Sequence, residues 1–333
     1  MGYSRVYGNI AQLYESKKDF TSAIKYYKKA KEKGYDVDAQ LARAELEKQN
    51  EEEFERMNGE CVAINEAIEK FKKQTAKNCT MIVIDKECPL NDILSSKIGG
   101  VPYMPIGEDW PKDSNGDEMP LLLQVNFKEM NSKQFPNHGI LEIFLDKSLG
   151  YPPEYVIKYY ENIDDEYRND IKPVDVSDFV TANSYKIVFK DAIDYMHTSD
   201  YRFEDEINKI LNDIIKDKKK TDEIIKYAKL TKSRMVEEAK DDKEIVSESI
   251  IEEIYYKIEN IQITMGGYPD FTQSDPRGYE KSKEHLTECL FKLDSCGEHE
   301  FYIGDSGIIS VLISMEDLKS ARFENAQLDW DCC

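Results

Sequence analysis

Residues 96–103 read Ser-Lys-Ile-Gly-Gly-Val-Pro-Tyr, and residues 263–270 read Ile-Thr-Met-Gly-Gly-Tyr-Pro-Asp. The two Gly-Gly pairs stand 167 positions apart. An apolar run comes after each pair, Leu-Leu-Leu-Gln-Val-Asn at 121–126 and Cys-Leu-Phe-Lys-Leu-Asp at 289–294, and these runs stand 168 positions apart. The Gly-Gly pairs predict turns that only glycine fits, and the runs predict buried strands.

A second pair of strands keeps the same spacing. Residues 139–144 read Gly-Ile-Leu-Glu-Ile-Phe and residues 307–312 read Gly-Ile-Ile-Ser-Val-Leu, again 168 positions apart. Chance similarities would scatter in their spacing, so a near-constant offset indicates one unit of turn, strand and strand that is used twice. We therefore expect an α+β fold whose mainly antiparallel β core is internally duplicated. Between these strands, Asn126 and Glu129 are spaced as in a capping box, which predicts a short helix.

The first 58 residues predict a helical appendage. Apolar side chains recur at helical spacing in two segments, the second of which ends at Gly34, a natural helix terminator. Small and aromatic residues are ordered there as in one tetratricopeptide hairpin, in which alanines let two helices approach closely. One repeat cannot bury its own face, so we expect it to pack on the segment C-terminal to it. Residues 59–333 then form the duplicated domain.

A helical insertion interrupts the second half of that domain at about residues 203–261. Isoleucines recur there every three or four positions among dense charges of both signs. This pattern is typical of solvated amphipathic helices. Two interpretations stay open, a docking arm for a partner and a cover for an exposed sheet edge.

The chain of 333 residues carries a formal net charge of −21. Such a charge repels nucleic acid and anionic membranes and attracts basic partners. No apolar run approaches the roughly 20 residues that span a bilayer. The sequence leads straight into a helical pattern without a signal-peptide core. We therefore expect a cytoplasmic protein that binds neither nucleic acid nor membrane, with its oligomeric state open.

No motif for a cofactor stands in the sequence. The seven cysteines form no CxxC pair, and their odd number argues against a complete disulfide framework. Zinc requires clustered thiols and imidazoles, whereas the four histidines are scattered. Neither of the common phosphate-binding glycine motifs occurs. We expect no metal, no nucleotide and no other cofactor.

The Gly-Asp-Ser-Gly tetrapeptide at residues 304–307 has the most catalytic appearance. A serine in a tight turn resembles a nucleophile elbow, but the GxSxG pattern is not satisfied. His299 is the one histidine close to it in sequence that could serve as its base. An ordinary turn, in which Asp305 binds its own backbone, explains the same residues. A hydrolase around Asp305 and Ser306 is therefore an alternative, and no residue is assigned as catalytic.

These motifs together resemble the YwqG-like bacterial family. The resemblance lies in Lys-Ile-Gly-Gly-Val-Pro-Tyr-Met-Pro at 97–105, Asp-Trp-Pro at 109–111, Gln-Ser-Asp-Pro-Arg at 273–277, Gly-Asp-Ser-Gly at 304–307 and Asp-Trp-Asp-Cys at 329–332. It runs in order from about residue 60 to residue 333, outside the insertion. It implies an α+β fold with internal duplication, and it implies no activity, because the function of that family is unknown.

Two residues depart from the family pattern. Lys292 stands where the family usually has glutamine, and Ile303 stands where it usually has tryptophan. If those side chains line a ligand pocket, this chain binds something else or nothing. The candidate site residues are those set in motifs, which form turns or line such a pocket. They are Gly99, Gly100, Pro102, Trp110, Gln124, Gly266, Gly267, Pro269, Gln273, Asp294, Gly304, Asp305, Gly307, Trp330 and Asp331.

Three functions are consistent with these observations. The first is an interaction protein, such as an immunity or antitoxin-like factor, that binds and blocks a basic partner protein such as a toxin. It rests on the acidic charge, the appended helices and the resemblance to proteins encoded near bacterial toxins. The second is a module that binds a small molecule or peptide in the cleft between the two halves. The third is the hydrolase.

Overall fold

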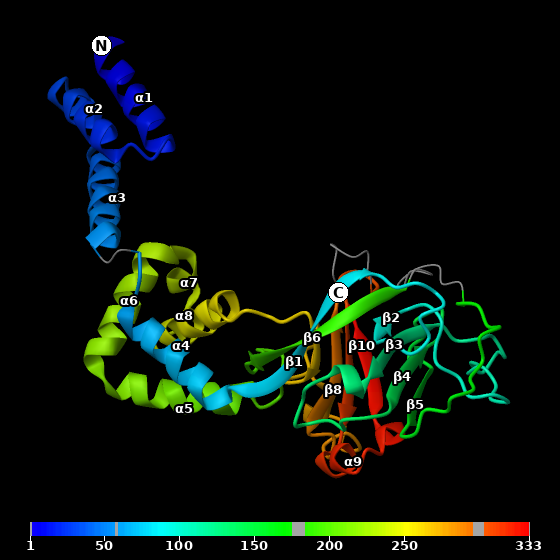
Figure 1. The fold of residues 1–333 in the computed structure, drawn as a ribbon. Coiled ribbons are helices and arrows are strands. Elements are labelled where there is room, and N and C mark those ends of the chain that lie inside the picture. Colours follow the sequence, from blue (N-terminus) through cyan, green and yellow to red (C-terminus); the bar gives the residue numbers. More distant parts are fainter. Residues whose placement is uncertain (1, 57–58, 175–183, 296–302, 333) are drawn as a thin grey trace. The chain divides into compact units, whose positions relative to one another are not determined.

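The computed structural model describes residues 2–56, 59–174, 184–295 and 303–332 (Figure 1). The chain divides into two compact units. The helical unit consists of Met1–Lys70 and Lys209–Ile254, and the sheet unit consists of Phe71–Asn208 and Tyr255–Cys333. Helices and an antiparallel sheet are both present, so the expected α+β class is confirmed.

The N-terminal helices pair as the sequence predicts. They are α1 (Gly2–Ser16), α2 (Phe20–Glu32) and α3 (Asp38–Arg56). Asp19 begins α2, because its carboxylate accepts the backbone N–H of Ser22 at 2.9 Å. Ala11, Ala23 and Ala30 are fully buried, so their small side chains allow close packing within the hairpin.

Five further helices lie later in the chain, and strands separate the first of them from the other four. They are α4 (Val62–Thr75), α5 (Phe203–Lys216), α6 (Lys218–Thr231), α7 (Ser233–Glu238) and α8 (Asp242–Lys257). Asp217 alone separates α5 from α6, and its carboxylate accepts the backbone N–H of Lys219 at 3.1 Å. The range of about 203–261, expected to be helical, contains α5 to α8.

A ten-stranded sheet organises the described part of the sheet unit (Figure 1). Its strands are β1 (Lys77–Glu87), β2 (Lys97–Ile98), β3 (Leu121–Asn126), β4 (Ile140–Leu145), β5 (Tyr155–Tyr160), β6 (Tyr185–Asp194), β7 (Ile263–Gly266), β8 (Glu288–Asp294), β9 (Ile308–Ile313) and β10 (Gln327–Asp331). Short helical turns connect them, namely η1 (Phe127–Glu129), η2 (Pro276–Gly278), α9 (Met315–Lys319) and η4 (Phe323–Asn325). Each of the pairings between neighbouring strands is antiparallel.

The strand order is β10-β9-β8-β7-β1-β6-β2-β3-β4-β5. The first half, β2 to β5, and the second half, β7 to β10, therefore flank the central strands β1 and β6. The register of β3 with β4 shifts at Leu122, and that of β8 with β9 shifts at Leu290. These two leucines stand 168 positions apart. The two halves thus share strand order and the position of a bulge.

Both faces of β4 are buried. Leu141, Ile143 and Leu145 join the main apolar cluster of the sheet unit. Ile140 and Phe144 join smaller clusters on the opposite face, which loops of the first half cover. Glu142 lies between them on that second face. A carboxyl group is therefore buried between two apolar clusters on this face.

The short helix expected after β3 is a single 3-10 turn, η1. The Asn126 side chain caps it by accepting the backbone N–H of Lys128 at 3.1 Å. The Glu129 carboxylate does not complete the expected capping box and instead accepts the backbone N–H of Ser96 at 2.9 Å. A tertiary contact thus replaces the local one.

Candidate functional site

Each half of the sheet carries a Gly-Gly turn whose backbone conformation favours glycine. The φ angles are positive at all four glycines, Gly99, Gly100, Gly266 and Gly267. A Cβ atom on Gly100 would lie 2.4 Å from Ser184 Oγ, and one on Gly267 would lie 2.5 Å from Asp194 Oδ2. The turns therefore fix the backbone that leads into Pro102 and Pro269.

Gln124 joins two loops of the first half. Its side chain is fully buried in β3. The Oε1 atom accepts the backbone N–H of Tyr103 at 2.7 Å, and Nε2 donates to the carbonyl oxygens of Ile93 at 2.7 Å and Ser95 at 2.9 Å. The Gln124 amide thus forms hydrogen bonds with the backbone of the segments that precede and follow β2 in the sequence. An apolar side chain at this position would leave the Tyr103 N–H group and the Ser95 carbonyl without this partner, while the Ile93 carbonyl would keep its bond from Lys97.

Tyr103 connects a third segment to this frame. It is fully buried, and its hydroxyl accepts the backbone N–H of Asp164 at 2.9 Å. Its ring centroid lies 5.1 Å from that of Tyr160 and 5.9 Å from that of Tyr167. Gln124 and Tyr103 together hold the segments around residues 93, 103 and 164–167 against one another.

A pocket of about 850 Å³ lies among these segments, and we call it the first-half pocket. Ile93, Val101, Tyr167 and Ile171 form apolar walls. Its further lining residues are Leu90, Asn91, Ile106, Asp165, Glu166, Asn169, Lys172 and Pro173. All of them belong to the first half, so this pocket is not a cleft between the halves.

Glu142 lies beneath this part of the first half in a polar row across the sheet. It pairs in register with Gln124 on one side and Lys158 on the other. It is fully buried, and neither carboxylate oxygen has a hydrogen-bond partner within the protein. Burial raises its pKa well above the ordinary value, although Lys158 and Lys97 oppose the shift. Burial therefore favours the protonated, uncharged form of the Glu142 carboxyl group.

Lys97 continues the row on β2, in register with Gln124. Its side chain is buried, and Nζ donates to the carbonyl oxygens of Asp92 at 2.7 Å and Ile93 at 3.0 Å. Burial lowers the pKa of Lys97 to about 8. The ammonium group is therefore held by backbone dipoles rather than by a close carboxylate.

Polar residues occupy the equivalent row of the second half, at offsets of 167 and 168. They are Thr264, Lys292 and Ser310, which pair with one another in register. Nζ of Lys292 lies 2.9 Å from Nε2 of His197 and donates to Oδ1 of Asn260 at 3.1 Å. Ser310 Oγ donates to the carbonyl oxygen of Asp270 at 2.9 Å. Lys292 thus takes a different set of partners from Gln124, its counterpart in the first half.

His197 lies between two carboxylates. Nε2 is 3.6 Å from Asp194 Oδ1, and Nδ1 is 3.8 Å from Asp270 Oδ2. Burial alone would raise the pKa of Asp194, but the contact with His197 and the charge of Lys292 lower it below its ordinary value. Lys292 and Asp194 are almost fully buried, so the cluster balances charge rather than facing a substrate.

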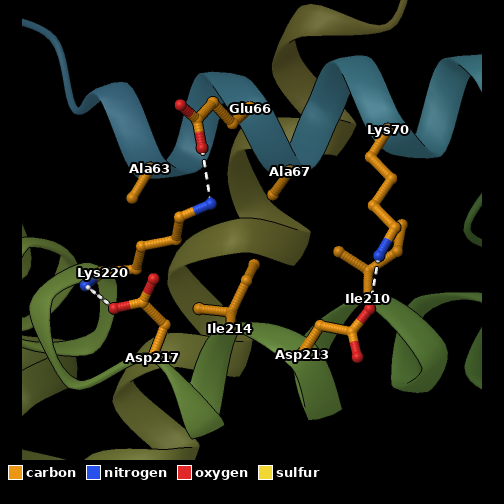
Figure 2. Close-up of a pocket in the computed structure, with 9 residues that line it drawn as sticks. All are labelled: Ala63, Glu66, Ala67, Lys70, Ile210, Asp213, Ile214, Asp217 and Lys220. Carbon is orange, nitrogen blue, oxygen red and sulfur yellow. Dashed lines mark hydrogen bonds and ion pairs between the residues drawn. The ribbon is translucent and has the colours of Figure 1, made fainter.

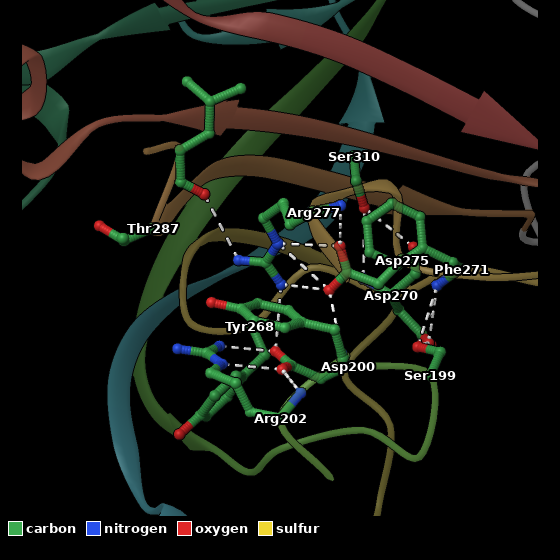
Figure 3. A network of polar contacts seen from close by, with 12 residues as sticks. Ser199, Asp200, Arg202, Tyr268, Asp270, Phe271, Asp275, Arg277, Thr287 and Ser310 are labelled. Atoms are coloured by element: carbon green, nitrogen blue, oxygen red, sulfur yellow. Dashed lines mark hydrogen bonds and ion pairs between the residues drawn. The ribbon is translucent and has the colours of Figure 1, made fainter. Parts of the chain in front are cut away.

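A buried ion network lies nearby in the second half (Figure 3). Asp275 accepts Nε and Nη2 of Arg277 at 2.9 and 2.6 Å, and Asp200 accepts Nη2 of the same arginine at 3.1 Å. Arg202 donates to Asp200 at 2.6 Å. Burial raises the pKa of Asp200, but its hydrogen bonds with Arg202 and the charge of Arg277 bring it below the ordinary value. The network ties the loop before α5 to η2.

Several predicted site residues meet near the end of the sheet. Asp331 accepts the backbone N–H groups of Thr272 at 3.0 Å and Gln273 at 2.9 Å. The Gln273 side chain donates to the Cys332 carbonyl at 2.8 Å. Gly304 and Gly307 pack against this segment, because Cβ atoms there would lie 3.0 Å from Cys332 Sγ and 2.4 Å from the Asp331 carbonyl oxygen. Trp330 donates to the Gly150 carbonyl at 3.1 Å.

The remaining predicted residues do not join a common site. Trp110 is buried and donates to the Met119 carbonyl at 2.6 Å. Asp294 ends β8, and burial together with the charge of Asp270 raises its pKa. Asp305 and Ser306 are exposed in a turn, and no hydrogen bond joins either to a histidine in the described ranges. His299, the expected base, lies outside them.

Sequence reasoning missed Glu142, His197 and Arg277 as central residues. A signal existed for Glu142, which is the single charged residue of an otherwise apolar strand, and for Lys292, which interrupts the apolar run of residues 289–293. Arg277 stood in a motif without an assigned role. His197 had no signal, since its partners Lys292 and Asp270 lie far from it in sequence.

The helical unit holds a smaller pocket of about 210 Å³ between α4 and α5 (Figure 2). Ala63 and Ala67 leave the space open, and Ile210 lines the opposite side. Two ion pairs with nitrogen–oxygen distances of 2.6 Å bridge it, Lys70–Asp213 and Lys220–Glu66. Ion pairs this exposed contribute little to stability, and we assign no ligand to this hollow.

Among the described residues, no group of three or more His, Cys, Asp or Glu side chains is arranged to hold a metal ion. Within the same ranges, no helix has both the length and the apolar character needed to cross a membrane.

A family model described as a domain of unknown function (DUF1963) matches residues 96–332. A tetratricopeptide repeat model matches residues 4–32. No curated protein matches the chain.

Proposed function

We propose a protein-binding function for this chain, which belongs to the DUF1963 family and carries a tetratricopeptide hairpin near its N-terminus. An exposed aliphatic stripe on α1 supports the proposal. Val6 and Leu13 are 50% and 56% exposed, and Ile10 between them is partly exposed. Their spacing of four and three residues places them on one helix face. A partner that presents an amphipathic helix or an apolar groove would bury this stripe.

The negative charge of residues 35–333 supports a basic partner for that part of the chain. Residues 1–34 hold eight Lys and Arg against three Asp and Glu, a net charge of +5, which leaves −26 on residues 35–333. A field of this size accelerates association with a partner of opposite sign, and the gain falls as salt is added. In its most specific form, the proposal is an immunity or antitoxin-like role in which the bound partner is a toxin.

Affinity capture with the full chain tests the proposal. Val6→Asp combined with Leu13→Asp places charge in the stripe, while Asn9→Asp with Gln12→Asp adds the same charge at exposed polar positions of α1. We expect the unchanged chain and the control to retain one dominant basic protein that the stripe variant loses, with equal melting temperatures. Equal capture by both variants would contradict the role of α1. Relief of that protein's toxicity by co-expression would test the immunity role.

The first-half pocket favours a second function, the binding of a small molecule or peptide. Its volume of about 850 Å³ lies within the usual range of ligand pockets. A thermal-shift screen tests this function with Tyr167→Ala, which removes a wall, and Tyr279→Ala, which removes a tyrosine that is 68% exposed elsewhere. A ligand that stabilises the unchanged chain and the Tyr279 variant, but not the Tyr167 variant, would support it. Equal stabilisation of all three would contradict it.

A further inference from the structure

We propose that the first-half pocket receives a segment of the partner protein in which an apolar side chain stands beside a lysine or arginine. This inference rests on the protein-binding function proposed above and names a surface and a chemistry for it. It places one contact of the basic partner on the sheet unit, apart from the α1 stripe. Three features of the pocket lead to it.

The first feature is an apolar wall that continues onto the exposed rim. Ile93 and Val101 are buried at 6% and 2% exposure. Leu90 and Ile106 also line the pocket, yet they are 50% and 65% exposed. An apolar side chain entering the pocket would cover these two rim residues and remove apolar surface from water.

The second feature is the charge of the rim. Residues 161–166 read Glu-Asn-Ile-Asp-Asp-Glu, and Asp165 and Glu166 line the pocket with exposed side chains. Lys172 is the one lysine or arginine among the lining residues. The neighbouring Arg168 is engaged by Asp170, at 3.2 Å. The rim therefore keeps a negative charge, which complements a basic side chain next to the apolar anchor.

The third feature is that the walls are fixed before binding. Gln124 holds the segments of Ile93 and Tyr103, and the Tyr103 hydroxyl holds the backbone of Asp164, directly before the acidic rim. Walls that are already ordered lose little conformational freedom when a ligand enters. The pocket therefore keeps its form before a partner segment enters it.

Fluorescence anisotropy with the full chain tests the inference. The probe is a short labelled peptide that alternates leucine and lysine, and its comparators alternate serine with lysine and leucine with glutamate. We expect saturable binding of the leucine–lysine peptide only. Asp165→Asn with Glu166→Gln should weaken it roughly two- to fivefold for each charge removed, as for other exposed ion pairs. Glu284→Gln with Glu324→Gln, a matched loss of charge elsewhere on the sheet unit, should leave it unchanged.

A rim variant separates the apolar contact from the charge. Ile106→Ser changes an exposed residue and should weaken the leucine–lysine peptide without unfolding the protein. No binding of this peptide, equal binding of the serine–lysine or leucine–glutamate peptide, or equal affinity of the two charge variants would each overturn the inference. The α1 stripe variants test the protein-binding function separately. If the peptide does not bind the pocket but partner capture still depends on α1, the inference about the pocket is wrong and the protein-binding function stands.

Discussion

The Gln124 side chain accepts the backbone N–H of Tyr103 at 2.7 Å and so fastens a pocket loop to the middle of a buried strand. Because the same amide also donates to two carbonyl groups before β2, it is the point at which the walls of the first-half pocket are joined. These hydrogen bonds to two loops explain why a glutamine stands in a mostly apolar strand.

Gln124→Ala should therefore destabilise the protein strongly. It leaves the Tyr103 N–H group and the Ser95 carbonyl buried without this partner, at roughly 1–3 kcal/mol for each group, while the Ile93 carbonyl keeps its bond from Lys97. We expect a loss of at least about 2 kcal/mol in urea unfolding. Gln273→Ala is the control, because its side chain makes one exposed hydrogen bond to Cys332, and it should cost less than about 1 kcal/mol. Equal losses for the two variants would contradict this role of Gln124.

Glu142→Gln should change the dependence of stability on pH. Burial raises the pKa of Glu142 above its ordinary 4.5, so above that pH the folded protein keeps a proton that the unfolded chain releases. Stability from this proton is full below the ordinary pKa and is lost as pH rises towards the raised one. The free energy of unfolding of Glu142→Gln should therefore increase relative to that of the unchanged chain as pH rises from 4 to 8. Urea unfolding at a series of pH values measures this difference. A difference in unfolding free energy that stays constant over this pH range would contradict a raised pKa of Glu142.

Arg277→Met should be among the most destabilising single changes in the second half. It leaves the carboxylates of Asp200 and Asp275 buried without their shared cation, which typically costs about 3–5 kcal/mol. Arg322→Met breaks comparable ion pairs with Glu316 and Asp317 at an arginine that is 42% exposed. This control should lose less than about 1 kcal/mol in the same denaturation experiment. A small effect at Arg277 would show that the network does not stabilise the fold.

Gly267→Ala separates a steric clash from backbone strain. Gly267 and Gly116 have similar φ angles of +77° and +86°, so alanine is strained at both by about 1–2 kcal/mol. A Cβ atom on Gly267 would also lie 2.5 Å from Asp194, whereas nothing lies within 4 Å of one on Gly116. We expect Gly267→Ala to lower the melting temperature clearly more than Gly116→Ala does. Equal melting temperatures would contradict a steric clash between this Cβ atom and Asp194.

Local pattern predicted several elements closely. The run expected at 121–126 is β3, and the segment expected to end at Gly34 is the second helix of a hairpin. These features depend on side-chain periodicity and on glycine at positive φ, which neighbouring residues alone decide. The capping box expected from Asn126 and Glu129 did not form, because Ser96, directly before β2 and distant in sequence, donates its N–H group to Glu129 instead.

The sequence by itself determined the four repeated strands β3, β4, β8 and β9, the two Gly-Gly turns and the helical hairpin, because each depends on residues that are close along the chain. Only the tertiary structure decided that Lys292 meets His197 across 95 positions, that Arg277 meets Asp200 across 77, and that Gln124 joins the walls of a pocket. Such contacts depend on strand register and on which loops close over a sheet face. A one-residue shift in register would turn Gln124, Glu142 and Lys292 to the other face, and no local pattern encodes which loops they would then meet.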